Sequence, residues 1–206
     1  YLMLEDGSVY EGTARGDFKE TACEIVFNTS MTGYVEILTD PSYAGQGVVM
    51  TYPMIGNYGI SREDFESERL QPSAFIVHEL SSDPSNFRCT DTIENLLKEY
   101  NIPCISGVDT RAVVKKLRES GTMRGVLTSD IGDRERLMDV IKSFRQIDLV
   151  GSVTAKQTKV YGEENTGAEI ALMDFGTKRN IVNNLVKRNC IVTVYPSFTS
   201  ADEIIK

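Results

Sequence analysis

The stretch FNTSMTGYVEILTDPSYAGQ, residues 27–46, combines residues that turn the backbone with many small hydroxyl side chains. Gly33 and the run Asp40-Pro41-Ser42 are turn signals, because glycine reaches positive φ and proline fixes φ at the start of a turn. The stretch contains no histidine and no cysteine. It therefore predicts a surface that contacts a polar small molecule, rather than a reaction centre complete in itself.

The composition outside this stretch is that of an ordinary globular protein, with 41% hydrophobic and 25% charged residues among 206. The net charge of −8 and the absence of long Lys/Arg runs argue against a nucleic-acid partner. No stretch approaches the roughly 20 apolar residues of a membrane span. The first residues also lack the basic start of a signal peptide. We therefore expect no nucleic acid and no membrane among its partners.

The cysteines and the single histidine predict no metal site. No two cysteines lie closer than fifteen residues, so there is no zinc-type spacing. Cys104 and Cys190 sit in apolar runs and are predicted to be buried, and His78 is predicted to be structural or superficial. A reducing cytoplasm is the simplest location. The other two cysteines are Cys23 and Cys89.

The first eighty residues are predicted to form mostly strands, with Asp6-Gly7 as a hairpin turn. The segment Ser61–Glu68 is either a short helix or a loop. The predicted strands are Tyr1–Glu5, Ser8–Gly12, Cys23–Asn28, Tyr34–Thr39, Gly47–Tyr52 and a region within Leu70–Leu80.

Helices follow, each opened by an aspartate. Asp91 is the expected N-cap of the first, because Glu94 three residues on completes a capping-box pattern. Apolar residues recur at three- and four-residue spacing in all of them. The predicted elements are a helix from Asp91, a helix from Asp109 ended by Gly121, a helix Asp133–Phe144, and strands Pro103–Val108 and Met123–Thr128.

The polar, weakly periodic range Val150–Ala168 is the predicted linker. A strand Ile170–Met173, a helix Thr177–Lys187 and a strand Ile191–Tyr195 then begin a parallel α/β domain. So short a piece buries little surface alone, so its strands are expected to pack on the first domain, pair with another copy or fray. The predicted division is a first domain at 1–150, a linker at 151–168 and an incomplete domain at 169–206.

Two further patterns have more than one interpretation. Asp174-Phe-Gly176 is predicted to be a strand-to-helix turn, since none of the other kinase motifs precedes it. A helix face formed by Arg111, Lys115, Lys116 and Arg118 is either a solvated surface or a subunit contact.

Several motifs in order carry a resemblance that runs from Leu2 to Lys206. They closely resemble the small, glutamine-hydrolysing subunit of carbamoyl phosphate synthetase. The motifs are Glu5-Asp6-Gly7, residues 27–34 (FNTSMTGY), residues 36–43 (EILTDPSY), Thr51-Tyr52-Pro53, Ile55-Gly56-Asn57, Ser85-Asn86-Phe87, Asp109-Thr110-Arg111, Asp174-Phe175-Gly176 and residues 178–181 (KRNI).

The resemblance implies an α/β protein. It has an N-terminal three-layer β/β/α domain of the swivelling type, followed by the opening of a class I glutamine amidotransferase domain, which is flavodoxin-like with a parallel sheet. The implied chemistry is glutamine hydrolysis by a cysteine nucleophile with a His/Glu pair. Ammonia then passes to a large subunit, which uses bicarbonate and two ATP to make carbamoyl phosphate for arginine and pyrimidine synthesis. ATP and a divalent metal are expected in that partner, and no cofactor in this chain.

The chain departs from the family pattern in its chemistry. No Gly-x-Cys-x-Gly turn occurs in it, and the downstream His and Glu are absent. We expect no catalytic residue among residues 1–206 and no glutaminase activity from them, as though the chain ended before the nucleophile. The alternative is a non-catalytic module that docks on the large subunit. A thiol hydrolase that pairs Cys89 or Cys23 with His78 is a third, remote hypothesis.

One ligand contact follows from the resemblance. Ser42 matches the family's serine near the substrate glutamine. A hydroxyl on a turn can reach the amino or carboxylate group of a ligand without bulk. The residues alone favour a plain β-turn at Asp40-Pro41-Ser42-Tyr43, and it is the resemblance that favours the ligand contact.

Overall fold

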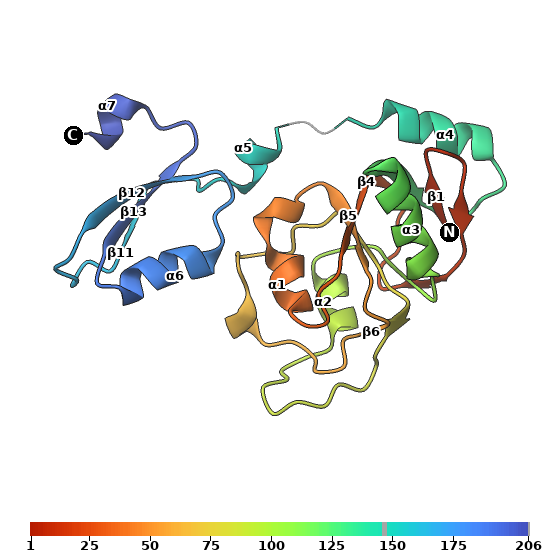
Figure 1. Ribbon diagram of the computed structural model, residues 1–206, viewed down its shortest axis with the longest axis horizontal. Coiled ribbons are helices and arrows are strands. Elements are labelled where there is room, and N and C mark those ends of the chain that lie inside the picture. The colour runs from red at the N-terminus through yellow and green to blue at the C-terminus, as the bar shows by residue number, and fades with distance from the viewer. Residues whose placement is uncertain (146–147, 206) are drawn as a thin grey trace.

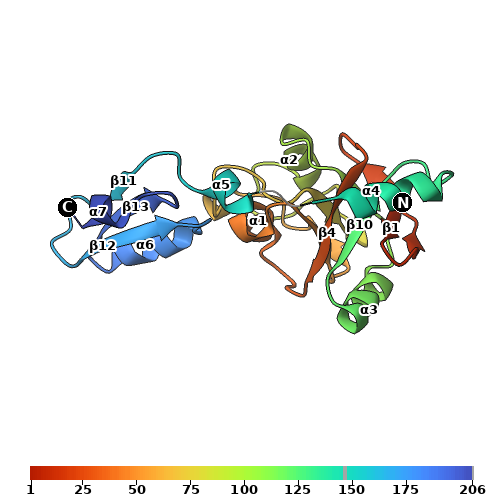
Figure 2. The ribbon, with the colours of Figure 1, turned by 90° about the horizontal axis from the view of Figure 1, so that it is seen from above.

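The computed structural model describes residues 1–145 and 148–205. Two bodies lie side by side in Figures 1 and 2. The first unit, residues 1–145, holds a large mixed sheet, and the second unit, residues 148–205, holds a small one. The predicted ranges 1–150 and 169–206 include three positions outside the described residues, namely 146, 147 and 206. Helices and strands alternate along both units, so the predicted α/β class is confirmed.

The large sheet has eight strands in the order β2-β1-β10-β4-β5-β7-β9-β3. Strands β4, β5, β7 and β9 run parallel at its centre, and the outer pairs are antiparallel. A separate parallel pair joins β6 and β8. The bounds are β1 Leu2–Leu4, β2 Val9–Tyr10, β3 Thr13–Arg15, β4 Thr21–Asn28, β5 Gln46–Met50, β6 Met54–Ile55, β7 Ala74–Ile76, β8 Glu79–Leu80, β9 Cys104–Ser106 and β10 Met123–Leu127.

Helices cover both faces of this sheet, and Figure 2 shows α2 and α3 on opposite sides of it. Alternate residues of one strand enter different cores, as the two-residue period of a strand requires: Val48 packs with α1 and α2, and Val49 with α3. A third core lies under α4. The helices are α1 Tyr34–Thr39, α2 Ile93–Glu99, α3 Thr110–Ser120, α4 Arg134–Ser143, α5 Leu149–Val153, α6 Arg179–Lys187 and α7 Ala201–Ile204, with short 3-10 turns η1 Pro41–Tyr43 and η2 Arg62–Asp64.

The prediction of a strand at Tyr34–Thr39 is wrong, because this segment is the helix α1. Its aromatic and β-branched residues favour a strand. Six residues are too few to distinguish the 3.6-residue period of a helix from the two-residue period of a strand. Gly33 precedes the helix with φ of 81°, which turns the chain away from the sheet. The Thr39 hydroxyl then donates to the Val35 carbonyl at 2.8 Å. The residues that the helix buries are Tyr34, Val35, Ile37, Leu38 and Thr39.

The predicted cap of the next helix is wrong by one residue. Thr92 is the N-cap of α2, since its side chain accepts from the Asn95 amide. The Asp91 carboxylate instead accepts from the Thr92 amide at 2.7 Å. Glu94 does not complete a capping box, because its carboxylate pairs with Lys98 at 3.1 Å. The aspartate caps predicted for α3 and α4 are confirmed.

The second unit has the predicted strand–helix–strand pattern. Strands β12, Glu169–Asp174, and β13, Ile191–Pro196, pair in parallel. Helix α6 packs on one face through Val182, which lies against Val192 and Val194. The range predicted as a linker holds residues of α5 and the edge strand β11, Lys159–Tyr161, which pairs antiparallel with β13. The domain boundaries at 150 and 168 stay a prediction.

A surface ion pair ties α4 to the large sheet and gives a pH-dependent prediction. Arg136 donates two hydrogen bonds to the Glu20 carboxylate, at 2.7 and 2.8 Å. With a further bond from Thr128, these hold the pKa of Glu20 at about 2. Because the pKa is lower in the folded state, the pair contributes its full stability above the pKa of the unfolded chain, about 4.5. This contribution is lost as the pH falls toward 2.

We therefore expect Glu20→Gln to lower the free energy of unfolding by about 0.5–1 kcal/mol at pH 7, because the pair is partly exposed. The cost relative to the unsubstituted protein should shrink between pH 4.5 and pH 2. Urea unfolding at several pH values measures this. Glu164→Gln, at an exposed glutamate in the second unit, is the control. A cost that stays constant down to pH 2 would contradict the assignment.

Candidate functional site

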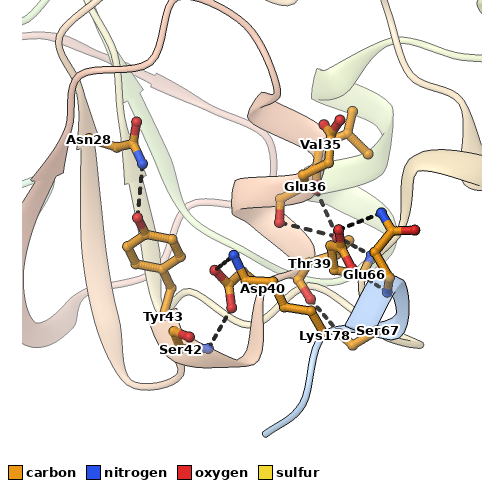
Figure 3. Close-up of polar contacts among 11 residues, drawn as sticks. Asn28, Val35, Glu36, Thr39, Asp40, Ser42, Tyr43, Glu66, Ser67 and Lys178 are labelled. Carbon is orange, nitrogen blue, oxygen red and sulfur yellow. Dashed lines mark hydrogen bonds and ion pairs between the residues drawn. The ribbon is translucent and has the colours of Figure 1, made fainter. Parts of the chain in front are cut away.

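The serine singled out from the sequence lies on a rigid turn. Helix α1 ends at Thr39, and Asp40 then caps the 3-10 turn Pro41–Tyr43. The Asp40 carboxylate accepts from the Ser42 amide at 2.9 Å, and Asp40 itself is buried (Figure 3). Ser42 is exposed, and no hydrogen bond of its hydroxyl is found among the described residues. The backbone of Ser42 is therefore held in place, while its hydroxyl is exposed and accessible to a ligand.

A tyrosine fixes the other end of this turn. The Asn28 amide group, at the end of β4, donates to the Tyr43 hydroxyl at 2.9 Å (Figure 3). Asn28 also accepts from the Ser30 amide at 2.7 Å. The end of a central strand, the loop after it and the serine turn are thus joined, although fourteen residues separate Asn28 from Ser42 in the sequence.

A second turn follows strand β12, as predicted for Asp174-Phe175-Gly176. The Asp174 carboxylate accepts from the amides of Gly176 and Thr177, at 2.9 and 2.7 Å. Its other oxygen accepts from the Ala155 amide at 2.6 Å. All of these partners are backbone amides, so the aspartate shapes a turn.

The two turns are in contact. The ammonium group of Lys178 lies 2.8 Å from the Asp40 carboxylate (Figure 3), and this hydrogen bond raises the pKa of Lys178. Gly176 has a φ of 101°, and a Cβ placed on it would lie 3.0 Å from Cβ of Pro41. The backbone of the second turn therefore approaches the serine turn as closely as a glycine allows.

A buried glutamate makes a second contact between the units. The Glu66 carboxylate accepts from the backbone amide and the side-chain amide of Asn180, at 2.9 and 2.8 Å. The Glu66 carbonyl accepts from the Arg179 amide at 2.8 Å. Helix α6 has no side-chain cap from its own N-cap residue, Lys178. A carboxylate of the first unit therefore caps a helix of the second, where the positive end of the helix dipole favours negative charge.

The same glutamate is anchored to the helix that ends at the serine turn. The Glu66 amide donates to the Thr39 hydroxyl at 2.9 Å, and the Ser67 hydroxyl donates to the Thr39 carbonyl at 2.6 Å. Thr39 is fully buried. Thr39 directly precedes Asp40. Asp40 binds Lys178, and Thr39 holds the glutamate that binds Asn180, so these two neighbouring residues support both contacts with the second unit. The position of Ser42 relative to the second unit is set by this chain of bonds (Figure 3).

The sequence predicted a ligand contact at Ser42, which stays a prediction, and assigned no role to Glu66. Lys178 and Asn180 lie in a motif that carries the resemblance, although the sequence assigned them no role. Glu66 sits in a charged segment, and its partner Asn180 is 114 residues away. No local sequence pattern predicts a contact between residues so far apart in the chain.

Two of the four cysteines are buried where a thiolate is disfavoured. Burial raises the pKa of both Cys23 and Cys104 to about 12. The predicted burial of Cys104 is confirmed, but that of Cys190 is wrong, because Cys190 is only partly buried, directly before β13. His78 lies at the surface, and its Nδ1 is 3.0 Å from the Val108 carbonyl. Within the described residues, no cluster of His, Cys, Asp and Glu could hold a metal, and no helix is long and apolar enough to cross a membrane.

The fold and the site together define the class of protein. It is an α/β protein in which a rigid serine turn of a large mixed sheet is held against a turn of a second, parallel-paired sheet. Residues 2–127 match the family model for the carbamoyl-phosphate synthase small chain, CPSase domain. The chain therefore belongs to the carbamoyl-phosphate synthase small-chain family.

Curated relatives agree along the whole chain. It is 47% identical over 206 residues to the carbamoyl phosphate synthase small chain of Clostridium perfringens, covering 100% of this chain and 58% of that protein. The small chains of Listeria monocytogenes and Staphylococcus saprophyticus are 44% and 46% identical, covering 99% and 100% of this chain and 56% of each relative. The chain thus spans a little over half the length of these relatives.

Proposed function

We propose that this chain is the small-subunit part of a glutamine-dependent carbamoyl phosphate synthetase. In the whole enzyme, glutamine would supply ammonia to a large subunit that makes carbamoyl phosphate from bicarbonate and two ATP. The family match over residues 2–127 and the relatives' name carry this proposal. ATP and a divalent metal would belong to the large subunit. The setting would be the cytoplasm, and the product would serve arginine and pyrimidine synthesis.

The finer fold is part of the proposal. The first unit would be the β/β/α swivelling-type domain, and the second the opening of a class I glutamine amidotransferase domain. The parallel pairing of β12 with β13 and the helix between them support the second assignment. The nucleophile would lie on a turn outside these residues, because Cys23 and Cys104 are buried and no Gly-x-Cys-x-Gly pattern surrounds any of the four cysteines.

Activity tests the proposal directly. A protein of the relatives' full length that carries these residues, mixed with a large carbamoyl phosphate synthase chain, should form carbamoyl phosphate from glutamine, bicarbonate and ATP. Residues 1–206 alone should release no ammonia from glutamine. Turnover by residues 1–206 would show that one of their own cysteines is reactive.

The Ser42 hydroxyl would contact the amino or carboxylate group of glutamine. We expect Ser42→Ala in the full-length protein to raise KM for glutamine about tenfold with little change in kcat, because a bond made equally to substrate and transition state affects binding alone. Steady-state glutaminase kinetics measure this. Ser82→Ala, at an exposed serine far along the chain, is the control. An unchanged KM would remove Ser42 from the glutamine site.

A further inference from the structure

A groove lies on the first unit, away from the contact between the two units. Its volume is ≈ 810 Å³, and helix α3 forms one wall with Arg111, Lys115 and Arg118. The facing residues include Thr51 and His78. The contact between His78 Nδ1 and the Val108 carbonyl holds the imidazole ring in place. The groove is therefore built from rigid elements and lined by long cationic side chains.

The three cations of the groove, Arg111, Lys115 and Arg118, have no ion-pair partner in the part of the chain that the structure describes. Lys116 of the same helix differs, since its ammonium group lies 3.0 Å from Asp6. The protein as a whole carries a net charge of −8. Asp109 and Glu119 also line the groove, so the three cations leave it with a small excess of positive charge, and this excess attracts negative charge.

The arrangement fits an extended acidic segment better than a small anion. The three cations lie at i, i+4 and i+7, so by helical rise they span about 10 Å. Carboxylates two or three residues apart on an extended chain lie about 7–10 Å apart. The N-terminus of α3, where a small anion would bind, is already occupied by the Asp109 carboxylate, which accepts from Ala112 at 2.9 Å.

We propose that this groove docks an acidic segment of the large carbamoyl phosphate synthase chain. The inference rests on the proposed function, which supplies the partner. It resolves the two interpretations of the basic helix face: Lys116 stabilises the first unit internally, and the other three cations form the docking surface. Glu119, which also lines the groove, would set the register by repelling a carboxylate placed opposite it.

Affinity measurements test the docking surface. In the full-length protein, the triple variant Arg111→Glu, Lys115→Glu and Arg118→Glu should bind a purified large chain about tenfold or more weakly, because attraction becomes repulsion. The same three positions changed to Gln should show a smaller loss. The unsubstituted protein should also lose affinity between 50 and 300 mM salt, and the Glu variant should lose less.

A control variant separates local from overall charge. Changing Lys142, Lys156 and Lys187 to Glu alters the net charge by the same amount at exposed lysines outside the groove. This control should retain the affinity. If the groove variants bind as tightly as the unsubstituted protein, the docking surface is refuted and the proposed function stands. If the unsubstituted protein itself does not bind the large chain, the partner and the proposed function both fail.

Cross-linking identifies the occupant. A carbodiimide joins a lysine amine directly to a carboxylate in contact with it, so Lys115 should become linked to an Asp or Glu of the large chain. Lys116 should instead link to Asp6 within the same chain. Mass spectrometry of the linked peptides would name the acidic segment. A complex that forms without any Lys115 link to the partner, while the Lys116 link appears, would overturn the proposal.

Discussion

Replacing Glu66 with alanine is expected to loosen the second unit from the first. The carboxylate accepts two hydrogen bonds from Asn180, and it caps α6 in place of a side chain from the helix's own N-cap residue. Hydrogen bonds to a charged group contribute about 1.5–3 kcal/mol, and an N-cap about 1 kcal/mol, while removing a buried charge recovers part of this. We expect a net loss of about 2–3 kcal/mol in the contact, which is a factor of about 30–150 in its equilibrium constant.

Amide hydrogen exchange measures this loss. The Asn180 amide donates to the Glu66 carboxylate, so it should exchange faster by about that factor. The Arg179 amide donates to the Glu66 carbonyl, which the substitution keeps, so its exchange should rise only as far as the two units separate. Amides of the central strands of the large sheet should keep their rates, because Glu66 does not enter their ladder. Glu66→Gln keeps one acceptor oxygen and should give an intermediate result.

Glu68→Ala is the matched control for this experiment. Glu68 lies two residues away on the same segment and is exposed. Its removal should leave the exchange of α6 unchanged. Equal protection of Arg179 and Asn180 in both variants would show that the α6 cap does not hold the units together, and that the Lys178–Asp40 pair and the packing of Gly176 suffice.

The elements that sequence predicted well are those with a local cause. Asp6-Gly7 turns a hairpin because Gly7 adopts a φ of 85°. Asp109 and Asp133 cap helices because their carboxylates reach amides three residues on. The prediction for Tyr34–Thr39 was wrong because its residue types favour a strand. In the structure the segment lies over the sheet, where it forms a helix and buries one helical face. Tertiary packing overrode propensity there.

In the candidate site, too, the feature with a local cause could be predicted and the long-range contacts could not. The Asp40-Pro41-Ser42 turn could be predicted, since its shape comes from neighbours in the chain. The contacts between this turn and the second unit could not be predicted, because 114 residues separate Asn180 from Glu66 and more still separate Lys178 from Asp40. Resemblance named the right motif around Lys178, but only the structure shows that its side chain meets Asp40. A polar contact between residues far apart in the sequence produces no periodic pattern from which it could be predicted.

Gly176→Ala is expected to force the two turns apart. A Cβ at this position would lie 2.9 Å from Val153 Cγ2 and 3.0 Å from Pro41 Cβ, well inside the 3.5–4.0 Å at which carbon atoms pack. The φ of 101° adds strain of about 1–2 kcal/mol for any residue with a Cβ. Overpacking adds about 1–3 kcal/mol. The contact should therefore weaken by about 2–5 kcal/mol, with faster exchange at Arg179 and Asn180 as the readout.

Gly7→Ala separates the two causes. Gly7 has a similar φ of 85°, but a Cβ there would meet nothing within 4 Å. It should show the backbone strain alone, as a loss of about 1–2 kcal/mol in the global stability of the first unit, with α6 exchange unchanged. If Gly176→Ala behaves like Gly7→Ala, the turns have room to move and do not hold Ser42 in a fixed position. If the loss at Gly176 is larger and confined to the contact, close packing of glycine on proline sets the distance between Ser42 and the second unit. In the full-length protein the same substitution should then raise KM for glutamine, although residue 176 offers no side chain to the substrate.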